Sequence, residues 1–257
     1  MKISIIVPVY NECRTLRQLV QRVRHAPLPP DCSAEMIVVD DGSTDGTAQI
    51  VAEEACAGNI VAQRLSRNLG KGSAIRAGIE ISCGEMILIQ DADLEYDPND
   101  YRALLEPLIN GKADVVYGSR FLGKAVGMRT SNRIANRILA AAANLLYGAQ
   151  ITDEATAYKA FRASLLRTLR LNCRRFEFCP EVTAKLRRLG YRIHEVPIHY
   201  IARDVAAGKK IRTRDGFEAL WTLLRYRLAP LSALLKPAVP SPKTREGAQK
   251  HAGVSAA

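Results

Sequence analysis

The sequence predicts an α/β fold in which helices cover both faces of a mostly parallel sheet. Two observations support this prediction. Short apolar runs rich in β-branched residues recur along the chain, and longer segments with apolar residues at helical spacing lie between them. Runs of the first kind are typical of strands buried on both faces, and their alternation with helices is typical of a parallel sheet. At 257 residues, the length allows one large domain or two small ones.

Strands and helices alternate through the first half of the chain. The earliest helical segment shows the spacing clearly, because Leu16, Leu19 and Val23 fall on one side of a helix. Strands are expected at residues 3–9, 36–39, 60–65, 86–90 and 114–117, and helices at residues 13–25, 45–56, 72–82 and 99–110. Ligands of such sheets bind beyond the carboxyl ends of the strands, so the turns after these strands are the expected place for a site.

The second half is expected to complete the same single domain. It contains an alanine-rich helix near 130–147, an amphipathic segment near 180–189, a strand at 191–200 and a last helix near 215–228. From Ala229 onward, proline and small residues dominate, as is typical of disordered tails. We therefore expect a folded domain over residues 1–228 and a disordered tail over residues 229–257.

The chain is strongly basic, with a formal net charge of +11 and a pI near 9.5. This charge favours anionic partners, namely nucleic acid, phosphorylated small molecules or an acidic membrane surface. Nucleic acid is not expected, because the basic residues concentrate only after residue 120 and form no recognisable nucleic-acid-binding module.

Cysteine usage and hydropathy indicate the cellular location. The 6 cysteines form no CxxC pair or metal-finger spacing, so reduced thiols in a cytosolic protein are expected. The opening MKISIIVPVY is apolar over too short a stretch for a signal peptide and is expected to be the first strand. No segment approaches the roughly 18 apolar residues of a membrane span, so any membrane contact is expected to be peripheral.

An acidic run, ILIQDADLEYDP, includes the end of the fourth expected strand. In an extended chain Asp91 and Asp93 point to the same side, where two carboxylates repel each other. Mg²⁺ or Mn²⁺ removes this repulsion and keeps coordination positions open for substrate phosphates, and Glu95 is a candidate third ligand. The alternative is a solvated turn or a helix start led by Asp97 and Pro98. The position after a buried strand favours the metal site.

Two glycine-containing turns are further candidates. In VVDDGSTDGT, Asp41 is the carboxylate expected to accept hydrogen bonds from a nucleobase, although these residues also suit a plain strand-to-helix turn. In NLGKGSA, Lys71 lies between two glycines where a helix is expected to start, which suits phosphate contact or again a simple turn. The second segment is not a Walker loop, because the position of the first glycine, residue 65, is Leu.

Basic residues gather in the later part of the chain. Arg120 follows the fifth expected strand in the segment GSRF, where the binding crevice of a parallel sheet lies. Any one of these cations alone is most simply a solvated surface charge. Together they could hold a phosphate group near the metal, and the set is Arg120, Arg129, Arg133, Arg203, Lys209 and Lys210.

Several catalytic classes are not indicated. His194 and His199 lie five positions apart in an expected strand, hence on opposite faces, so a metal shared by them is not expected and both are interpreted as structural. The chain has no GxSxG elbow, Ser-His-Asp arrangement or GxGxxG fingerprint, which argues against hydrolase and dinucleotide-dependent chemistry.

The segments PVYNE, VVDDGSTDGT, NLGKGSA, DADLE and GSR resemble, in order and spacing, the family 2 inverting glycosyltransferases of GT-A fold. Later segments, TDEATAYKAFR, FEFCPEVTAKLRRLGYRIHEVPIHY and GKKI, resemble the branch that includes dolichyl-phosphate mannose and glucose synthases. The resemblance covers roughly residues 1–228. One departure is Ala155, where this branch often has Glu, and it leaves Asp153 as the remaining acid in that segment.

The resemblance implies a role for each matching residue. The nucleotide of the sugar donor is expected to contact Pro8, Tyr10, Glu12 and Asp41. The metal on the donor diphosphate, Mg²⁺ or Mn²⁺, is expected to bind Asp91 and Asp93. The phosphate of the acceptor is expected to face Arg120, Arg203 and one of Arg129 and Arg133.

The expected reaction is inverting transfer of a hexose from UDP-glucose or GDP-mannose to a polyprenyl or dolichyl phosphate, at the cytoplasmic face of a membrane. Such an acceptor is already anionic and needs mainly positioning by the cations. A hydroxyl acceptor, on a glycan or a small alcohol, would need a general base, for which Asp153 is the candidate. A non-catalytic scaffold that binds nucleotide sugars is a further alternative, and the intact Asp91 and Asp93 argue against it.

The last expected helix carries a set of large apolar residues that suits either contact with an acidic bilayer or packing inside the protein. These residues are Trp221, Leu223, Leu224 and Tyr226. The oligomeric state is left open.

Overall fold

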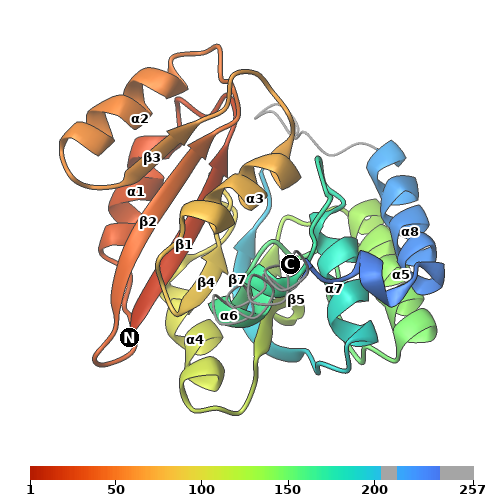
Figure 1. Cartoon of the computed structure of the whole chain (residues 1–257). Coiled ribbons are helices and arrows are strands. Elements are labelled where there is room, and N and C mark those ends of the chain that lie inside the picture. Colours follow the sequence, from red (N-terminus) through yellow and green to blue (C-terminus); the bar gives the residue numbers. More distant parts are fainter. Residues whose placement is uncertain (204–212, 238–257) are drawn as a thin grey trace, which may run out of the picture.

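The computed structural model describes residues 1–203 and 213–237. Its centre is a seven-stranded sheet in the order β3-β2-β1-β4-β6-β5-β7 (Figure 1). All the described strands except β6 run in the same direction, which confirms the predicted mostly parallel α/β fold. The strands are β1 (Lys2–Val9), β2 (Ser33–Asp40), β3 (Val61–Arg64), β4 (Met86–Ile89), β5 (Val115–Val126), β6 (Lys159–Arg162) and β7 (His194–Ile201).

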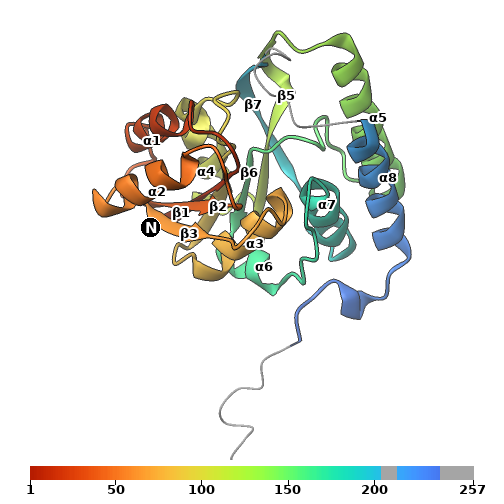
Figure 2. The same ribbon diagram turned by 90° about the horizontal axis from the view of Figure 1, so that it is seen from above.

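Helices cover both faces of the sheet, as Figure 2 shows. The helices α1, α2 and α4 pack on one face, and α3, α6 and α7 pack on the other. Their bounds are α1 (Leu16–Arg24), α2 (Thr47–Cys56), α3 (Lys71–Ile81), α4 (Tyr101–Ile109), α6 (Ala163–Thr168) and α7 (Phe178–Arg188), with a 3-10 turn η1 (Pro98–Asp100) before α4.

Two further helices, α5 (Thr130–Tyr147) and α8 (Thr213–Leu228), form an outer layer against α7. Ala143 of α5, Ala184 of α7 and Leu223 of α8 are all fully buried where the three helices meet. Within the described residues, no helix combines the length and the hydrophobicity that crossing a bilayer requires.

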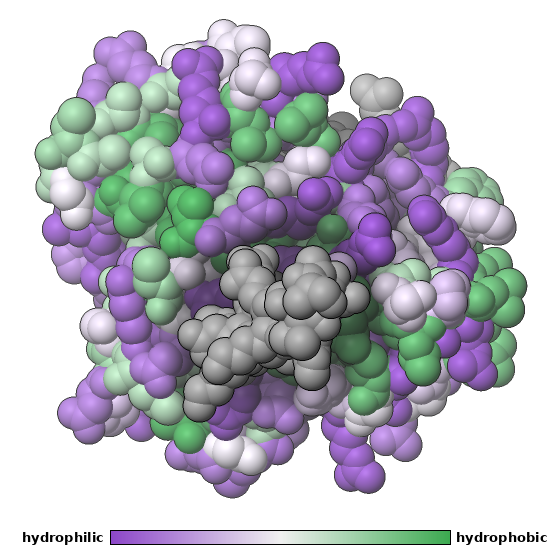
Figure 3. Space-filling view, in the orientation of Figure 1, coloured by the Kyte–Doolittle hydropathy of each residue, from purple (hydrophilic) through white to green (hydrophobic). Residues whose placement is uncertain are grey.

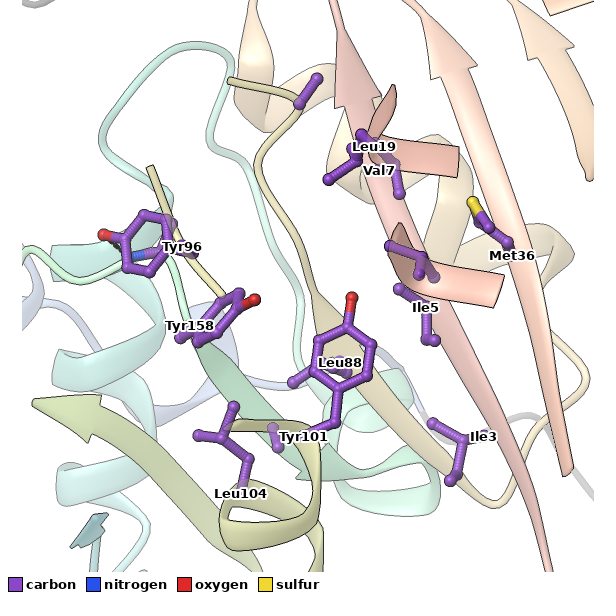
Figure 4. Close-up of a cluster of buried hydrophobic side chains, with 14 of the residues drawn as sticks. Ile3, Ile5, Val7, Leu19, Met36, Leu88, Tyr96, Tyr101, Leu104 and Tyr158 are labelled. Carbon is purple, nitrogen blue, oxygen red and sulfur yellow. Dashed lines mark hydrogen bonds between the residues drawn. The ribbon is translucent and has the colours of Figure 1, made fainter. Parts of the chain in front are cut away.

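The alternation of side chains along β1 gives the sheet two separate cores. Ile3, Ile5 and Val7 pack with α1 and α4, whereas Ile6 points to the opposite face and packs with α3. Figure 4 shows the first of these cores, in which residues from β1, α1, β2 and α4 converge. Each such side chain contributes about 1.5–3 kcal/mol when fully buried. The two cores therefore hold the strands rigidly enough to present a defined edge.

The strand β6 and the short helix α6 were not predicted from the sequence. The strand is only KAFR, which is too short to show a period of two. It forms because it fills the space between β4 and β5 and pairs antiparallel with both. The formation of β6 depends on tertiary contacts, which leave no local signal in the sequence.

The expected tail contains packed residues at its start. Leu234 is fully buried against Leu223 and Tyr226, and residues Leu231–Ala233 form the 3-10 turn η3. Two backbone hydrogen bonds join this segment to the end of α6 and the residues after it, from Arg170 N–H to the carbonyl of Leu234 and from Lys236 N–H to the carbonyl of Thr168. The expected end of the folded domain at residue 228 is therefore too early. Leu234 lies among prolines and small residues in the sequence, but it packs in an apolar cluster. Residues 238–257 lie outside the described part.

Candidate active site

The candidate site lies at the carboxyl edge of the sheet, where the turns after β1 and β2 are tied together. The backbone N–H of Asn11 donates to Ser43 Oγ at 2.9 Å, and the N–H of Thr44 donates back to Asn11 Oδ1 at 2.8 Å. The N–H of Glu12 donates to Thr47 Oγ1 at 2.9 Å. Asn11 has φ +52°, a left-handed conformation that Asn tolerates. These bonds fix Tyr10 and Glu12, two predicted donor-binding residues, at the edge.

Asp41 joins the two glycine-containing segments. Its Oδ1 accepts from the N–H of Leu69 at 2.7 Å and its Oδ2 from the N–H of Gly70 at 2.8 Å. The side chain is almost fully buried, and this burial raises the pKa of Asp41. The carboxylate therefore fastens the loop before α3, and its contact with a nucleobase stays a prediction.

The glycines around Lys71 are required by packing. Gly70 has φ +96°, and a Cβ there would lie 2.4 Å from the carbonyl oxygen of Arg174. A Cβ at Gly72 would lie 2.9 Å from the carbonyl carbon of Cys173. Lys71 itself reaches the acidic run, because its Nζ lies 2.5 Å from Asp91 Oδ1. The structural explanation accounts for the glycines, and the position of the lysine still suits a phosphate.

The acidic residues lie in a turn. The strand β4 ends at Ile89, and Ala92 and Asp93 form a turn that continues into Leu94, at φ +61°. The expectation that Asp91 and Asp93 share the face of an extended strand is therefore wrong. The two carboxylates nevertheless interact, because the charge of Asp91 contributes to the pKa of Asp93.

Lys71 and Arg203 only partly offset the negative charge around Asp93. Burial, the charge of Asp91 and the charge of Glu95 together raise the pKa of Asp93 to about 7, against the opposing effect of Arg203 and Lys71. A carboxyl group with this pKa gains from any additional cation placed beside it. Two adjacent hard oxygen donors that need a cation fit Mg²⁺ or Mn²⁺.

Arg203 bridges the ends of three strands. Its guanidinium lies 3.0 Å from Asp93 Oδ2 and 3.3 Å from Glu12 Oε2. Its backbone N–H donates to Glu95 Oε1 at 2.9 Å. The segments after β1, β4 and β7 thus meet at Arg203.

Both carboxylate oxygens of Glu95 already have partners. Its Oε2 accepts from the hydroxyl of Tyr200 at 2.7 Å, and its Oε1 accepts from Arg203. Across residues 1–203 and 213–237, no three His, Cys, Asp or Glu side chains converge on a point that could hold a metal ion. A cation here would therefore be held by two carboxylates and by oxygens of a substrate.

Arg120 and Asp153 form a buried ion pair. Asp153 is fully buried, and its two oxygens accept from Arg120 Nε at 2.6 Å and from Arg120 Nη2 at 2.7 Å. Glu195 in turn accepts from the N–H of Asp153 at 3.0 Å. The guanidinium of Arg120 also lies over the ring of Tyr200, 5.2 Å from its centre. This geometry suits an acid that positions an arginine and does not suit a general base, which must reach its substrate.

The remaining predicted cations lie at the rim or beyond the described residues. Arg129 and Arg133 are exposed at the start of α5. The segment that precedes α5 runs beside the segment that leads to Arg203, because the N–H of Ala202 donates to the carbonyl of Val126 at 3.0 Å. Lys209 and Lys210 lie outside the described residues. Pro8 is buried in β1 and holds the strand end that carries Tyr10.

Sequence reasoning missed a buried group of polar residues behind the acidic turn. Gln90 is fully buried, and its Oε1 accepts from the hydroxyls of Tyr101 at 2.7 Å and Tyr158 at 2.6 Å. Its Nε2 donates to the carbonyl of Asp91 at 2.9 Å. Figure 4 shows Tyr96, Tyr101 and Tyr158 gathered in this region. The only signal in the sequence is a glutamine that follows an otherwise apolar buried strand.

The sequence and the fold of this chain are similar to those of known proteins. The family model described as glycosyl transferase family 2 matches residues 4–170, which is more than half of the chain. The chain belongs to glycosyl transferase family 2. The predicted resemblance is confirmed, and so is the prediction that the chain is a glycosyltransferase enzyme.

Family 2 members with curated names support the same branch. The undecaprenyl-phosphate mannosyltransferase of Micrococcus luteus is 32% identical, over 89% of this chain and 99% of that protein. The dodecaprenyl-phosphate galacturonate synthase of Rhizobium johnstonii is 30% identical, over 90% of this chain and 69% of that protein. The sugars in these two names differ, so the relatives do not indicate one donor.

Solved structures establish the fold of this family 2 chain. Glucosyl-3-phosphoglycerate synthase from Mycobacterium tuberculosis, in complex with Mn²⁺, uridine diphosphate and phosphoglyceric acid, superposes with a TM-score of 0.68 at 22% identity. The match covers 90% of this chain and 80% of that one. At this identity the likeness shows the fold alone, and it confirms the predicted GT-A architecture.

Proposed function

We propose that this enzyme transfers a hexose from a nucleoside diphosphate sugar, UDP-glucose or GDP-mannose, to a polyprenyl phosphate, with inversion at the anomeric carbon. The observation that carries the proposal is the acid cluster of Asp91 and Asp93 at the carboxyl edge of the sheet, bracketed by Lys71 and Arg203. The names of the family 2 relatives, both of which contain a polyprenyl phosphate, support the acceptor class.

The donor would bind between the turns after β1 and β2. Tyr10, Glu12 and Asp41 would contact the nucleotide, with Pro8 supporting the strand end, and Lys71 would contact the diphosphate. Asp91 and Asp93 would hold Mg²⁺ or Mn²⁺, which stabilises negative charge on a departing diphosphate. On binding, Arg203 would exchange its contact with Asp93 for a contact with phosphate oxygens, because a cation would then neutralise that carboxylate.

The acceptor would lie on the side of Arg120 and Arg203. Two phosphorylated substrates repel each other, and a guanidinium group offers the planar, charged donors that hold a phosphate oxygen in line for attack. The buried carboxylate of Asp153 and the ring of Tyr200 fix Arg120, so its side chain loses little orientational freedom when the substrate binds. Arg129 and Arg133 at the rim would add to the positive field.

A phosphate acceptor is favoured over a hydroxyl acceptor by the position of Asp153. A hydroxyl must lose a proton to a base, whereas a phosphate monoester oxygen is already anionic near neutral pH. Asp153 was the candidate base, and it is fully buried with both oxygens bonded to Arg120. Transfer to a hydroxyl on a glycan or small alcohol remains the second candidate. The reaction would take place at the cytoplasmic face of a membrane, where the enzyme binds peripherally.

A matched pair of acceptors tests the proposal. The enzyme is incubated with radiolabelled UDP-glucose or GDP-mannose, Mn²⁺, and either a short polyprenyl phosphate or the corresponding polyprenol. Label is expected in the organic phase only with the phosphate. Label carried by the polyprenol alone, or donor consumption with all label in water, would refute the lipid-phosphate acceptor.

A variant pair tests the metal site in the same assay. Asp93→Asn removes a carboxylate from the cluster and is expected to lower transfer about 100-fold or more. Glu106→Gln likewise replaces a carboxylate by an amide, at a side chain exposed on α4, and it is expected to leave transfer unchanged. Full activity of Asp93→Asn would contradict the metal role. A nucleotide-sugar-binding scaffold would bind UDP or GDP with Mn²⁺ and show no turnover with any acceptor.

A further inference from the structure

Residues 172–175, which precede α7, connect that helix to the start of α3. The helices α3 and α7 lie on the same face of the sheet and share one hydrophobic core (Figure 2). The 172–175 segment itself forms neither helix nor strand. Hydrophilic residues cover much of the surface between α3 and α8 (Figure 3), and the side chains of Asn172 and Arg174 are exposed. The connection is therefore made by the backbone of the segment.

Two glutamates at the start of α7 hold the N–H groups of the 172–175 segment. Glu177, the residue just before the helix, accepts from the N–H groups of Arg174 at 2.6 Å and Arg175 at 2.8 Å, one on each carboxylate oxygen. Glu181, in the first turn, accepts from the two preceding N–H groups at 2.8 Å and 2.6 Å. Four consecutive N–H groups thus bond two carboxylates, which fixes the direction of the segment.

The carbonyl groups of the same segment face α3. The carbonyl of Arg175 accepts from the N–H of Gly72 at 2.9 Å, and the carbonyl of Arg174 accepts from the N–H of Ser73 at 3.0 Å. The first N–H groups of a helix have no partner within it, so these two bonds cap α3. A phosphate cannot bond these N–H groups without displacing the carbonyls. The phosphate contact at this helix start is therefore left to the side chain of Lys71.

Contacts with α8 fix both ends of the segment. Glu181 is fully buried, and its Oε1 also accepts from Lys185 Nζ at 2.6 Å and from the hydroxyl of Tyr226 on α8 at 2.8 Å. At the other end, the guanidinium of Arg175 lies 3.1 Å from Asp215 Oδ1 at the start of α8. A buried carboxylate with this many donors keeps one orientation. The segment is therefore a rigid support for the start of α3.

We propose that Glu177 is a positioning residue for the sugar donor and that it acts through the 172–175 segment and Lys71. Its two hydrogen bonds hold the carbonyls that cap α3, and the start of α3 sets where Lys71 Nζ lies beside Asp91. The inference rests on the proposed function, in which Lys71 contacts the donor diphosphate. Glu177 acts on the backbone of the segment and not on the substrate.

Glu177→Gln tests the proposal in the full-length enzyme. The variant keeps the size of the side chain, but an amide NH₂ replaces one acceptor and faces a backbone N–H. We expect the Kd for UDP or GDP with Mn²⁺, and the KM for the donor, to rise about tenfold. The KM for the acceptor should not change. Calorimetric titration and initial rates measure these constants, and an unchanged nucleotide Kd would overturn the inference.

A double-mutant cycle decides whether Glu177 acts through Lys71. Lys71→Met removes the amine and should weaken binding of UDP or GDP with Mn²⁺ about tenfold or more. In this background Glu177→Gln is expected to have no further effect on the nucleotide Kd, because the group that it positions is gone. Losses that multiply in the double variant would contradict the proposal, since they would mean that the segment acts on the donor by another route.

Glu35→Gln is the matched control for loss of stability. Glu35 also accepts from a backbone N–H, that of Cys83 at 2.7 Å, and from the hydroxyl of Ser4 at 2.5 Å. It lies near the start of β2, at the amino edge of the sheet, opposite the site. We expect urea unfolding to show a loss of stability in both variants and the nucleotide Kd to rise only in Glu177→Gln. An equal rise in both would reduce the effect to stability and refute the inference.

Hydrogen exchange separates this inference from the proposed function. The amides of Gly72 and Ser73 should exchange faster in Glu177→Gln than in the parent, and at the parent rate in Glu35→Gln. Normal nucleotide binding by the parent together with equal exchange in all three proteins would refute the inference alone. A parent enzyme that binds neither UDP nor GDP with Mn²⁺ would refute the proposed function, and the donor role of Glu177 with it.

Discussion

Gln90 holds the acidic turn through the backbone. Its amide nitrogen bonds the carbonyl of Asp91, while its amide oxygen is fixed by Tyr101 and Tyr158. The two bonds from the tyrosine hydroxyls are buried, where water cannot replace them, and the bond to Asp91 is partly buried. Residues that orient a ligand in this way commonly change its metal affinity although they never touch the metal.

Replacing Gln90 with leucine is expected to have two effects. Stability should fall by about 1–3 kcal/mol, because two buried tyrosine hydroxyls lose their acceptor. Affinity for Mn²⁺ with UDP should fall about 10- to 100-fold, because the carbonyl of Asp91 is released. Denaturant unfolding and calorimetric titration measure the two. Tyr101→Phe is the control, and it should lower stability without a change in metal affinity. A folded Gln90→Leu variant with normal affinity would show that Gln90 is structural alone.

Variants of the ion pair between Arg120 and Asp153 are expected to separate effects on stability from effects on sugar transfer. Asp153→Ala is expected to destabilise the protein by about 3–5 kcal/mol, because it leaves a buried guanidinium without its partner. The double variant Arg120→Met with Asp153→Leu should recover most of this loss in urea unfolding and still fail to transfer sugar. Recovery of transfer together with stability would contradict the role of Arg120 at the acceptor.

The position of a residue relative to the end of a predicted strand was enough to identify some residues of the candidate site and not others. Asp91 and Asp93 follow the end of β4, and parallel strands bring their ends to one edge whatever the rest of the fold does. Arg120 lies inside β5, so the expected end of that strand at residue 117 was too early. Glu195 and Tyr200 were missed, because each acts through a contact with a segment far away in the sequence. A single sequence contains no local sign of such a contact.

At the scale of elements, the reversal of β6 places Asp153 at the site. Because β6 runs against its neighbours, its first residue lies at the carboxyl end of β4, with Lys159 beside Ile89. The segment before β6 therefore arrives beside Arg120, which bonds Asp153 from within β5. A parallel strand in this position would have carried Asp153 to the opposite end of the sheet.

The strand β7 is fastened to the turn η1, just before α4, by a titratable contact. The imidazole of His199 lies 2.8 Å from Asp100 Oδ1, and its backbone N–H donates to Asp100 Oδ2 at 2.6 Å. The hydrogen bond to Asp100 raises the pKa of His199 above its ordinary value of 6.5. The charged form is thus stabilised by folding.

His199→Gln is expected to change the pH dependence of stability. A raised pKa contributes stability that is fully present below pH 6.5 and is lost as the pH rises through the folded-state pKa. The side chain is exposed, so the contribution is below about 1 kcal/mol. Thermal unfolding should show the variant less stable than the parent at acidic pH and equal to it at alkaline pH. A difference that does not vary with pH would assign the effect to packing.

At the scale of the whole molecule, the packed segment after α8 closes the outer layer. Leu234 is fully buried and inserts against Leu223 and Tyr226. Leu234→Ala is expected to cost about 2–5 kcal/mol, since it leaves a cavity in this cluster. A chain ending at residue 228 should be destabilised at least as much, and a chain ending at residue 237 should unfold like the full chain. Urea denaturation of the three forms measures this, and equal stability of both truncations would restore the earlier boundary.

The sequence by itself determined the alternation of strands and helices, the edge at which the site lies, and the family. These features follow from local periodicity and from residues that come directly after a strand. Each such signal is contained within a single segment of the sequence. The tertiary structure alone decided that Asp153 is buried behind Arg120, that Gln90 supports the acidic turn, and that α5 and α8 keep an apolar side in solvent. Each of these depends on which distant segments pack together, and burial is a property of the packed whole.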